Sequence, residues 1–60
     1  MIVEWQWSDA DADSEKEFEN LREVQVWLQG QREEDFSWIY LYDNNGNELA
    51  ASFLQILELK

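Results

Sequence analysis

Apolar and polar positions alternate in two segments of the chain, and this alternation predicts two β-strands. A period of two, carried by aromatic and β-branched residues, is typical of a strand with one buried face. In the first segment, residues 2–7, one face carries Val3, Trp5 and Trp7. In the second segment, residues 36–43, one face carries Phe36, Trp38, Tyr40 and Tyr42, and the other carries Ser37, Ile39 and Leu41.

The spacing becomes helical between these strands, after an acidic loop at residues 8–13. Ser14 followed by Glu17 fits a capping box, in which a hydroxyl and a carboxylate satisfy the free backbone N–H groups at a helix start. We therefore expect a helix from about residue 15 to residue 29, which Gly30 is well placed to end. Its apolar stripe consists of Phe18, Leu21, Val24 and Leu28, with Gln25 inside it and Trp27 beside it.

The last part of the chain begins with a turn signal. Residues 43–47 are Asp-Asn-Asn-Gly-Asn, which favours a hairpin turn because Asn and Gly accept a positive φ at low cost. Residues 48–59 fit the spacing of a strand and also that of a helix, and the hairpin turn before them favours the strand.

The expected order of strand, helix, strand and strand indicates an α+β fold. We expect residues 1–60 to form a single small β-α-β-β domain, with a three-stranded, mainly antiparallel sheet and one helix packed on one face. The strand at 36–43 should lie in the centre, antiparallel to both others. Its Ile39 and Leu41 should then pack under the helix, against Phe18, Leu21 and Leu28.

This arrangement leaves large rings on the sheet face that the helix does not cover. The rings expected there are Trp38, Tyr40 and Tyr42, with Trp5 and Trp7 near them. A contiguous patch of Trp and Tyr is typical of an interaction surface. Two alternatives remain open: the faces are reversed, so that the rings form the core, or a two-fold homodimer buries them.

Composition narrows the chemistry that the chain can perform. It has 14 Asp and Glu residues against 4 Lys and Arg residues, a net charge of −10, and no His, Cys or Pro. These numbers exclude disulfides, Cys or His zinc sites and Ser-His-Asp catalysis, and the scarcity of cations argues against direct binding to nucleic acid. Without a glycine-rich phosphate loop or room for a usual pocket, we expect no enzymatic activity and no cofactor.

The loop residues Asp9, Asp11 and Asp13 resemble the first three ligand positions of an EF-hand calcium loop. The resemblance ends there, since Ser14 stands where that family has Gly and Asn20 stands where it has the closing Glu. We therefore expect a solvated acidic loop before a helix, and no metal site.

The negative charge is concentrated in two runs, which together form a candidate acidic binding surface. It consists of Asp9, Asp11, Asp13, Glu15, Glu17, Glu19, Glu23, Glu33, Glu34 and Asp35. Carboxylates spaced along a rigid scaffold can imitate the phosphates of a nucleic acid and attract a basic groove. Alternatively, the excess acid simply keeps a small, aromatic-rich protein soluble.

In length and composition the chain resembles small phage-encoded inhibitors, such as anti-CRISPR proteins and other DNA mimics, although no motif assigns it to one family. We expect a binding protein that occupies the basic surface of a nucleic-acid-binding protein. The alternative is a structural or assembly module that homodimerises, or docks as a subunit, through the aromatic face. No secretory signal or bilayer-length apolar stretch is visible, so we expect a cytoplasmic protein (in the host cell, if phage-encoded) with no membrane partner.

Overall fold

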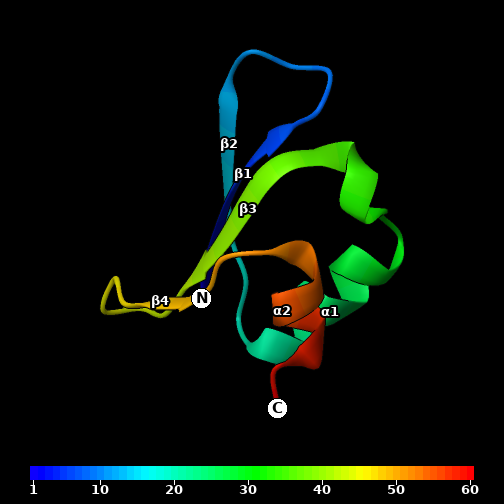
Figure 1. The fold of residues 1–60 in the computed structure, drawn as a ribbon. Helices are drawn as coiled ribbons and strands as arrows, with labels where there is room; N and C mark the ends of the chain where they lie inside the picture. The colour runs from blue at the N-terminus through cyan, green and yellow to red at the C-terminus, as the bar shows by residue number, and fades with distance from the viewer.

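The computed structural model describes residues 1–60 and shows an α+β fold with four strands and two α-helices. The four strands form one antiparallel sheet in the order β2-β1-β3-β4, and both helices lie on the same side of it (Figure 1). In chain order the elements are β1 (Ile2–Trp7), β2 (Asp13–Glu17), α1 (Leu21–Gln29), the 3₁₀ turn η1 (Glu33–Asp35), β3 (Phe36–Tyr42), β4 (Glu48–Ala50) and α2 (Phe53–Glu58).

The expectation of an antiparallel sheet with β3 between two antiparallel neighbours is confirmed, but the expected numbers of strands and helices are wrong. Residues 13–17 form the additional strand β2, which pairs with β1 from Ile2↔Glu17 to Gln6↔Asp13. Its charged residues have little intrinsic preference for a strand, so pairing with β1 overrides local propensity. Short, charged strands are typical of sheet edges, where charge discourages further pairing.

Helix α1 therefore begins later than the sequence pattern predicted. Asn20 is its N-cap, and its side-chain Oδ1 accepts a hydrogen bond of 2.9 Å from the backbone N–H of Glu23. The Glu23 carboxylate in turn accepts a bond of 3.2 Å from the backbone N–H of Glu19. Asn20 and Glu23 therefore satisfy backbone N–H groups at the helix start, a role that the pattern predicted for Ser14 and Glu17.

The C-terminal segment contains both of the structures that its spacing allowed. The predicted strand covers only β4, and α2 follows it after a cap at Ser52, whose hydroxyl accepts a bond of 3.1 Å from the backbone N–H of Gln55. The Gln55 side chain in turn accepts a bond of 2.8 Å from the N–H of Ala51, the residue before the cap. Phe53 and Ile56 lie three residues apart on one face of α2 and are buried.

The core lies between the sheet and the two helices. Ile39 and Leu41 are buried there together with Phe18 and Leu28, as the pattern predicted. Leu21, which was expected with them, is only partly buried and packs against this core. The remaining buried residues are Val3, Trp5, Val24, Phe36, Ala50, Phe53 and Ile56. Neither helix is long and apolar enough to cross a membrane.

The prediction that Trp5 and Trp7 lie near the uncovered sheet face is wrong, because both lie on the core side, and Phe36 lies there too instead of on the face of Trp38. Trp5 is buried, and Trp7 and Phe36 stack with ring centroids 5.0 Å apart. Trp5 and Trp7 lie there because Val3 and Trp5 pair with the core residues Leu41 and Ile39, so this face of β1 points toward the helices. Phe36 lies there because of a bulge: Gln6 pairs with Trp38 and Trp7 pairs with Phe36, so Ser37 is an extra residue and the alternation of β3 reverses there. Trp27 of α1 lies among these rings, 4.9 Å from Trp5.

Candidate protein-binding surface

The sheet face away from the helices has no element packed on it, and we call it the open face (Figure 1). Residues directly opposite each other in an antiparallel pair point to the same face, so the register identifies its side chains. Three rows cross the open face: Asp13–Gln6–Trp38, Glu15–Glu4–Tyr40 and Glu17–Ile2–Tyr42. On β4, Glu48 pairs with Tyr42 and extends the last row.

An aromatic stripe runs along β3 on the open face. It consists of Trp38, Tyr40 and Tyr42, which are all partly buried. The ring centroids of Trp38 and Tyr40 are 5.5 Å apart, and those of Tyr40 and Tyr42 are 6.3 Å apart. These separations are within the range of favourable aromatic pairs, so each ring of the stripe interacts with its neighbour.

A second stripe, of carboxylates, runs beside the rings. It consists of Asp13, Glu15 and Glu17 on β2, with Glu4 on β1 and Glu48 on β4 completing the acidic set of the open face. Successive residues on one face of a strand are about 7 Å apart, so β2 presents an evenly spaced row of negative charge. The acidic and aromatic residues therefore share one surface, whereas the sequence suggested two separate surfaces.

Glu4 and Glu48 were absent from the predicted acidic surface. The alternation of β1 places Glu4 opposite to Val3 and Trp5, but only the register shows that it stands between Glu15 and Tyr40. Glu48 follows the hairpin turn, and its pairing with Tyr42 likewise depends on how the strands meet.

The electrostatics of the open face affect Tyr42 directly. Burial of the phenol raises the pKa of Tyr42 above its ordinary value of 10.0, and the nearby charges of Glu4 and Glu48 raise it further. Both effects disfavour the phenolate, so the Tyr42 hydroxyl stays protonated and remains a hydrogen-bond donor in an acidic surface.

The other predicted acidic residues lie away from the three rows. Asp9 and Asp11 lie in the turn between β1 and β2, so the chain enters a hairpin there and does not form the EF-hand geometry. Glu19 and Glu23 belong to the start of α1, where together with Glu17 they line a hollow beside Met1. The Met1 amine donates to the backbone carbonyl of Phe18 at 2.8 Å.

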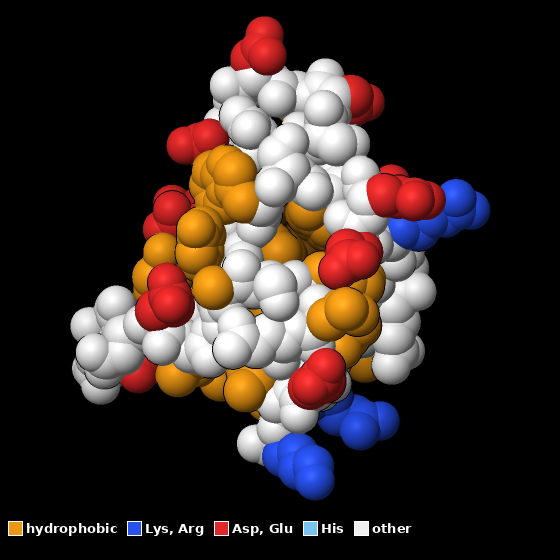
Figure 2. All heavy atoms as spheres, in the orientation of Figure 1, with side chains coloured by type: hydrophobic (Ala, Val, Ile, Leu, Met, Phe, Trp, Pro, Cys, Tyr) orange, Lys and Arg blue, Asp and Glu red, His pale blue; other side chains and the backbone are white.

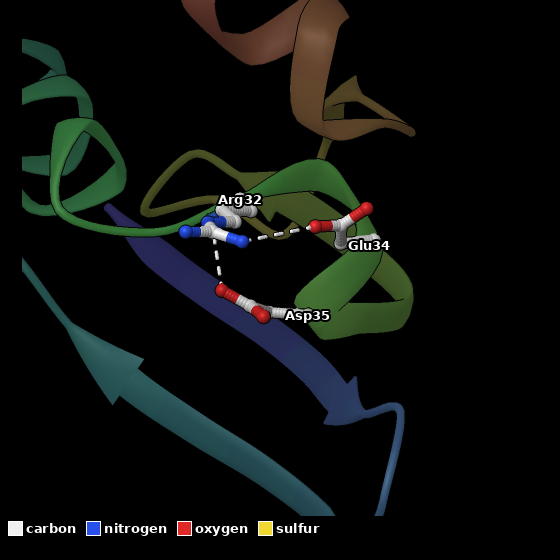
Figure 3. Close-up of polar contacts among 3 residues, drawn as sticks. All are labelled: Arg32, Glu34 and Asp35. Carbon is white, nitrogen blue, oxygen red and sulfur yellow. Dashed lines mark hydrogen bonds and ion pairs between the residues drawn. The ribbon is translucent and has the colours of Figure 1, made fainter.

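The last acidic run, at residues 33–35, forms η1 beside the start of β3 (Figure 3). The Asp35 carboxylate accepts a bond of 2.9 Å from the backbone N–H of Arg32, and the Arg32 guanidinium lies 3.4 Å from Glu34. This is the single ion pair of the structure, and its side chains are 79% and 74% exposed, so it contributes little to stability. The carboxylates of the open face have no cationic side chain within ion-pair distance.

The four cationic side chains do not neutralise the open face. Lys16 pairs with Val3, so it points to the helix side, where its Nζ lies 5.1 Å from the centre of the Phe18 ring. Figure 2 shows the same separation: carboxylates and hydrophobic side chains alternate along the side away from the helices, while the visible Lys and Arg side chains lie at the right and the bottom.

No protein-family model matches the chain, and no curated protein or solved structure matches it significantly.

Proposed function

We propose that the chain is a small, non-enzymatic binding protein whose open face occupies the basic surface of a nucleic-acid-binding protein. One observation carries this proposal: five carboxylates and three adjacent rings share a sheet face that no other element covers. The carboxylates would attract a basic surface at long range, and the rings would anchor it at short range.

The arrangement of the acidic residues supports binding over solubility alone. Glu4 and Glu15 are direct cross-strand partners, and like charges in that position destabilise a sheet. Solubility requires exposed charge but does not require charges to face each other on one surface. A local conflict of this kind is expected where a surface is shaped for function at the expense of stability.

The aromatic stripe suits the same partner. Arg and Lys side chains that bind phosphates are attracted to the faces of Trp and Tyr rings. A basic surface could therefore place cations over Trp38 and Tyr40 while other cations pair with Glu4 and Glu15. Nucleic acids offer a comparable combination, since they present regular negative charge beside stacked planar rings.

The homodimer is a less favourable use of the same face. Two copies stacked open face to open face would bring two uncompensated acidic stripes together, and their repulsion would oppose association. Sedimentation equilibrium at micromolar concentration is expected to show one species near 7.2 kDa. A species of twice that mass that disappears in Trp38→Ala would support the assembly function instead.

A capture experiment tests the proposal with matched baits. The wild-type chain is immobilised beside an open-face variant, Glu4→Gln/Glu15→Gln/Glu17→Gln, and a control variant with the same net charge, Asp11→Asn/Glu19→Gln/Glu58→Gln. We expect the wild type and the control variant to retain a protein that the open-face variant does not retain. Duplex DNA should elute this protein from both baits.

The capture experiment has two contradicting outcomes. Equal retention on the two variants would show that charge anywhere on the chain is enough. A retained protein that duplex DNA does not displace would contradict the mimicry. Circular dichroism of each bait provides the folding control.

A further inference from the structure

The outer edge of β3 is unpaired over half of its length. On one side, β1 pairs with β3 from Tyr42 to Phe36, whereas on the other side β4 pairs only with Leu41 and Tyr42. After Ala50 the chain leaves the line of the strand, because Ser52 caps α2. The position beside residues 36–39 is therefore vacant, although a longer β4 would have filled it.

Few other groups bond to this edge. The backbone N–H of Phe36 donates to the carbonyl of Glu33 in η1. The backbone hydrogen bonds formed in turns and loops do not involve residues 37–39, and no side chain bonds to the backbone of these residues. The edge also carries no charge and no proline, the usual protections against pairing. At the opposite edge of the sheet, β2 is protected by its charged side chains.

A shallow groove lies along this edge. Its walls are residues 36–39 of β3 and residues 51–53 at the start of α2, and its volume is about 230 Å³. That volume is below the usual range for a small-molecule pocket, roughly 300–1,000 Å³, but it suits the side chains of an added strand. The side chains that line it include Phe36, Ile39 and Phe53, so the groove is mainly apolar.

Charge along this edge of the sheet indicates a basic occupant. Glu33 lines the groove, with Glu34 next to it in η1, and Glu48 lies on β4, beyond the opposite end of the groove, beside Tyr42. If a second copy paired antiparallel with residues 36–39, each η1 would approach the partner's β4 and bring carboxylates together. A cationic segment would instead be attracted by the carboxylates of η1 and of β4.

We propose that residues 36–39 bind an extended, basic segment of the partner protein as an additional strand beside β3. The proposal rests on the proposed function and specifies how the partner is held. Alternate side chains of the added strand would enter the groove against Phe36 and Phe53. The side chains between them would lie beside Trp38 on the open face, where cations can contact the aromatic stripe.

A short synthetic peptide tests the proposal. The peptide acetyl-Arg-Val-Arg-Val-Arg-amide spans about 17 Å when extended, slightly more than the vacant edge. A second peptide of the same sequence carries N-methyl groups on both valines, which retains charge and side chains but removes backbone donors. Both are titrated into the ¹⁵N-labelled full chain, and amide shifts and hydrogen exchange are followed.

The unmodified peptide is expected to shift the amides of residues 36–39 and 51–53 and to slow exchange along the edge. N-methylation should weaken binding by about tenfold or more, because two backbone bonds are lost. Replacing Glu33 and Glu48 by Gln should weaken it by up to about fivefold for each exposed pair. The same two substitutions placed at Glu19 and Glu58 serve as the control and should have a smaller effect.

Three results would overturn the proposal. Equal binding of the two peptides would show attraction by charge alone, and no binding of the unmodified peptide would show that the edge does not accept a strand. Concentration-dependent protection of residues 36–39 without peptide would show that a second copy occupies the edge. None of these results depends on the three open-face substitutions of the capture experiment, which test the proposed function independently.

Discussion

Gln25 connects the two helices, and its replacement provides a quantitative test of the fold. Its Nε2 donates to the backbone carbonyls of Ile56 and Leu59 at 3.0 and 2.9 Å. Those carbonyls lie at the C-terminal end of α2, which is only six residues long. A helix of that length is not stable alone, so α2 depends on its buried side and on these bonds.

Gln25→Leu keeps the volume of the side chain and removes both donors. Each lost bond should cost about 0.5–1.5 kcal/mol, so we expect a loss of about 1–3 kcal/mol. A chain of this length has a total stability of roughly 3–9 kcal/mol. The variant should therefore lose a large fraction of its stability, and its melting temperature should fall by about 4–8 °C for each kcal/mol.

Gln25→Glu gives the prediction a distinctive pH dependence. The introduced carboxylate would face two carbonyl oxygens, which raises its pKa in the folded state above the unfolded value of about 4.3. Its protonated form can donate one bond, so the folded state binds the proton more tightly. Relative to Gln25→Leu, this variant should be more stable below about pH 4 and should lose that advantage as the pH rises through the raised pKa.

The assay is urea denaturation from pH 3 to 8, followed by Trp fluorescence and far-UV circular dichroism. Trp27 lies in the aromatic cluster of the core, so both signals should report the same transition with an unchanged m-value. A Gln25→Leu variant as stable as the wild type would show that the two hydrogen bonds do not stabilise α2. Equal stability of Gln25→Leu and Gln25→Glu at every pH would show that the introduced carboxyl does not face the two carbonyls.

Three further substitutions test other parts of the account. Glu4→Gln removes the repulsion between residue 4 and Glu15, so it should raise the free energy of unfolding by about 0.2–1 kcal/mol and the urea midpoint with it. An unchanged or lower midpoint would mean that the two carboxylates do not repel each other. Hydrogen bonds from the hairpin turn lower the pKa of Asp43 in the folded state. The ionised carboxylate therefore stabilises the fold above its unfolded pKa, and this stabilisation is lost as the pH falls through the folded pKa. In Asp43→Ala the urea midpoint should fall less steeply as the solution is acidified, and an unchanged pH dependence would contradict this. Gly46 has φ +85° and open space around it, so Gly46→Ala should lower the stability by about 1–2 kcal/mol through backbone strain alone. Gly30 has φ −89°, so Gly30→Ala should cause no such strain. Equal melting temperatures of the two variants would contradict this explanation.

Local patterns predicted the parts of the fold that depend on local chemistry. The alternation in β1 and β3 identified both strands, and the Asn-Gly turn identified the hairpin that joins β3 to β4. Helix α1 was recognised from its apolar spacing, but its start was placed too early. Ser14 and Asn20 are both suitable N-cap residues. Because Ser14 is part of β2 and pairs with β1, the helix begins after Asn20.

The composition of the open face could not be predicted, because it depends on register. The aromatic stripe follows from the alternation of β3, but the acidic row beside it exists only because residues 13–17 form a strand next to β1. The place of Phe36 depends on the bulge at Ser37, which carries no local signal of its own. The side chains that share the open face are therefore set by pairing between distant segments, which the periodicity of one segment cannot predict.

The open face is the central claim, and its most direct test is the rate at which the chain associates with the protein it captures. Stopped-flow Trp fluorescence would measure this rate constant for the wild type and for Glu4→Gln/Glu15→Gln/Glu17→Gln at about 50 and about 300 mM salt. The account predicts that the wild-type rate falls by roughly tenfold or more with salt, and that the variant is slow and nearly salt-independent. Equal rates and equal salt dependence in the two proteins would contradict it.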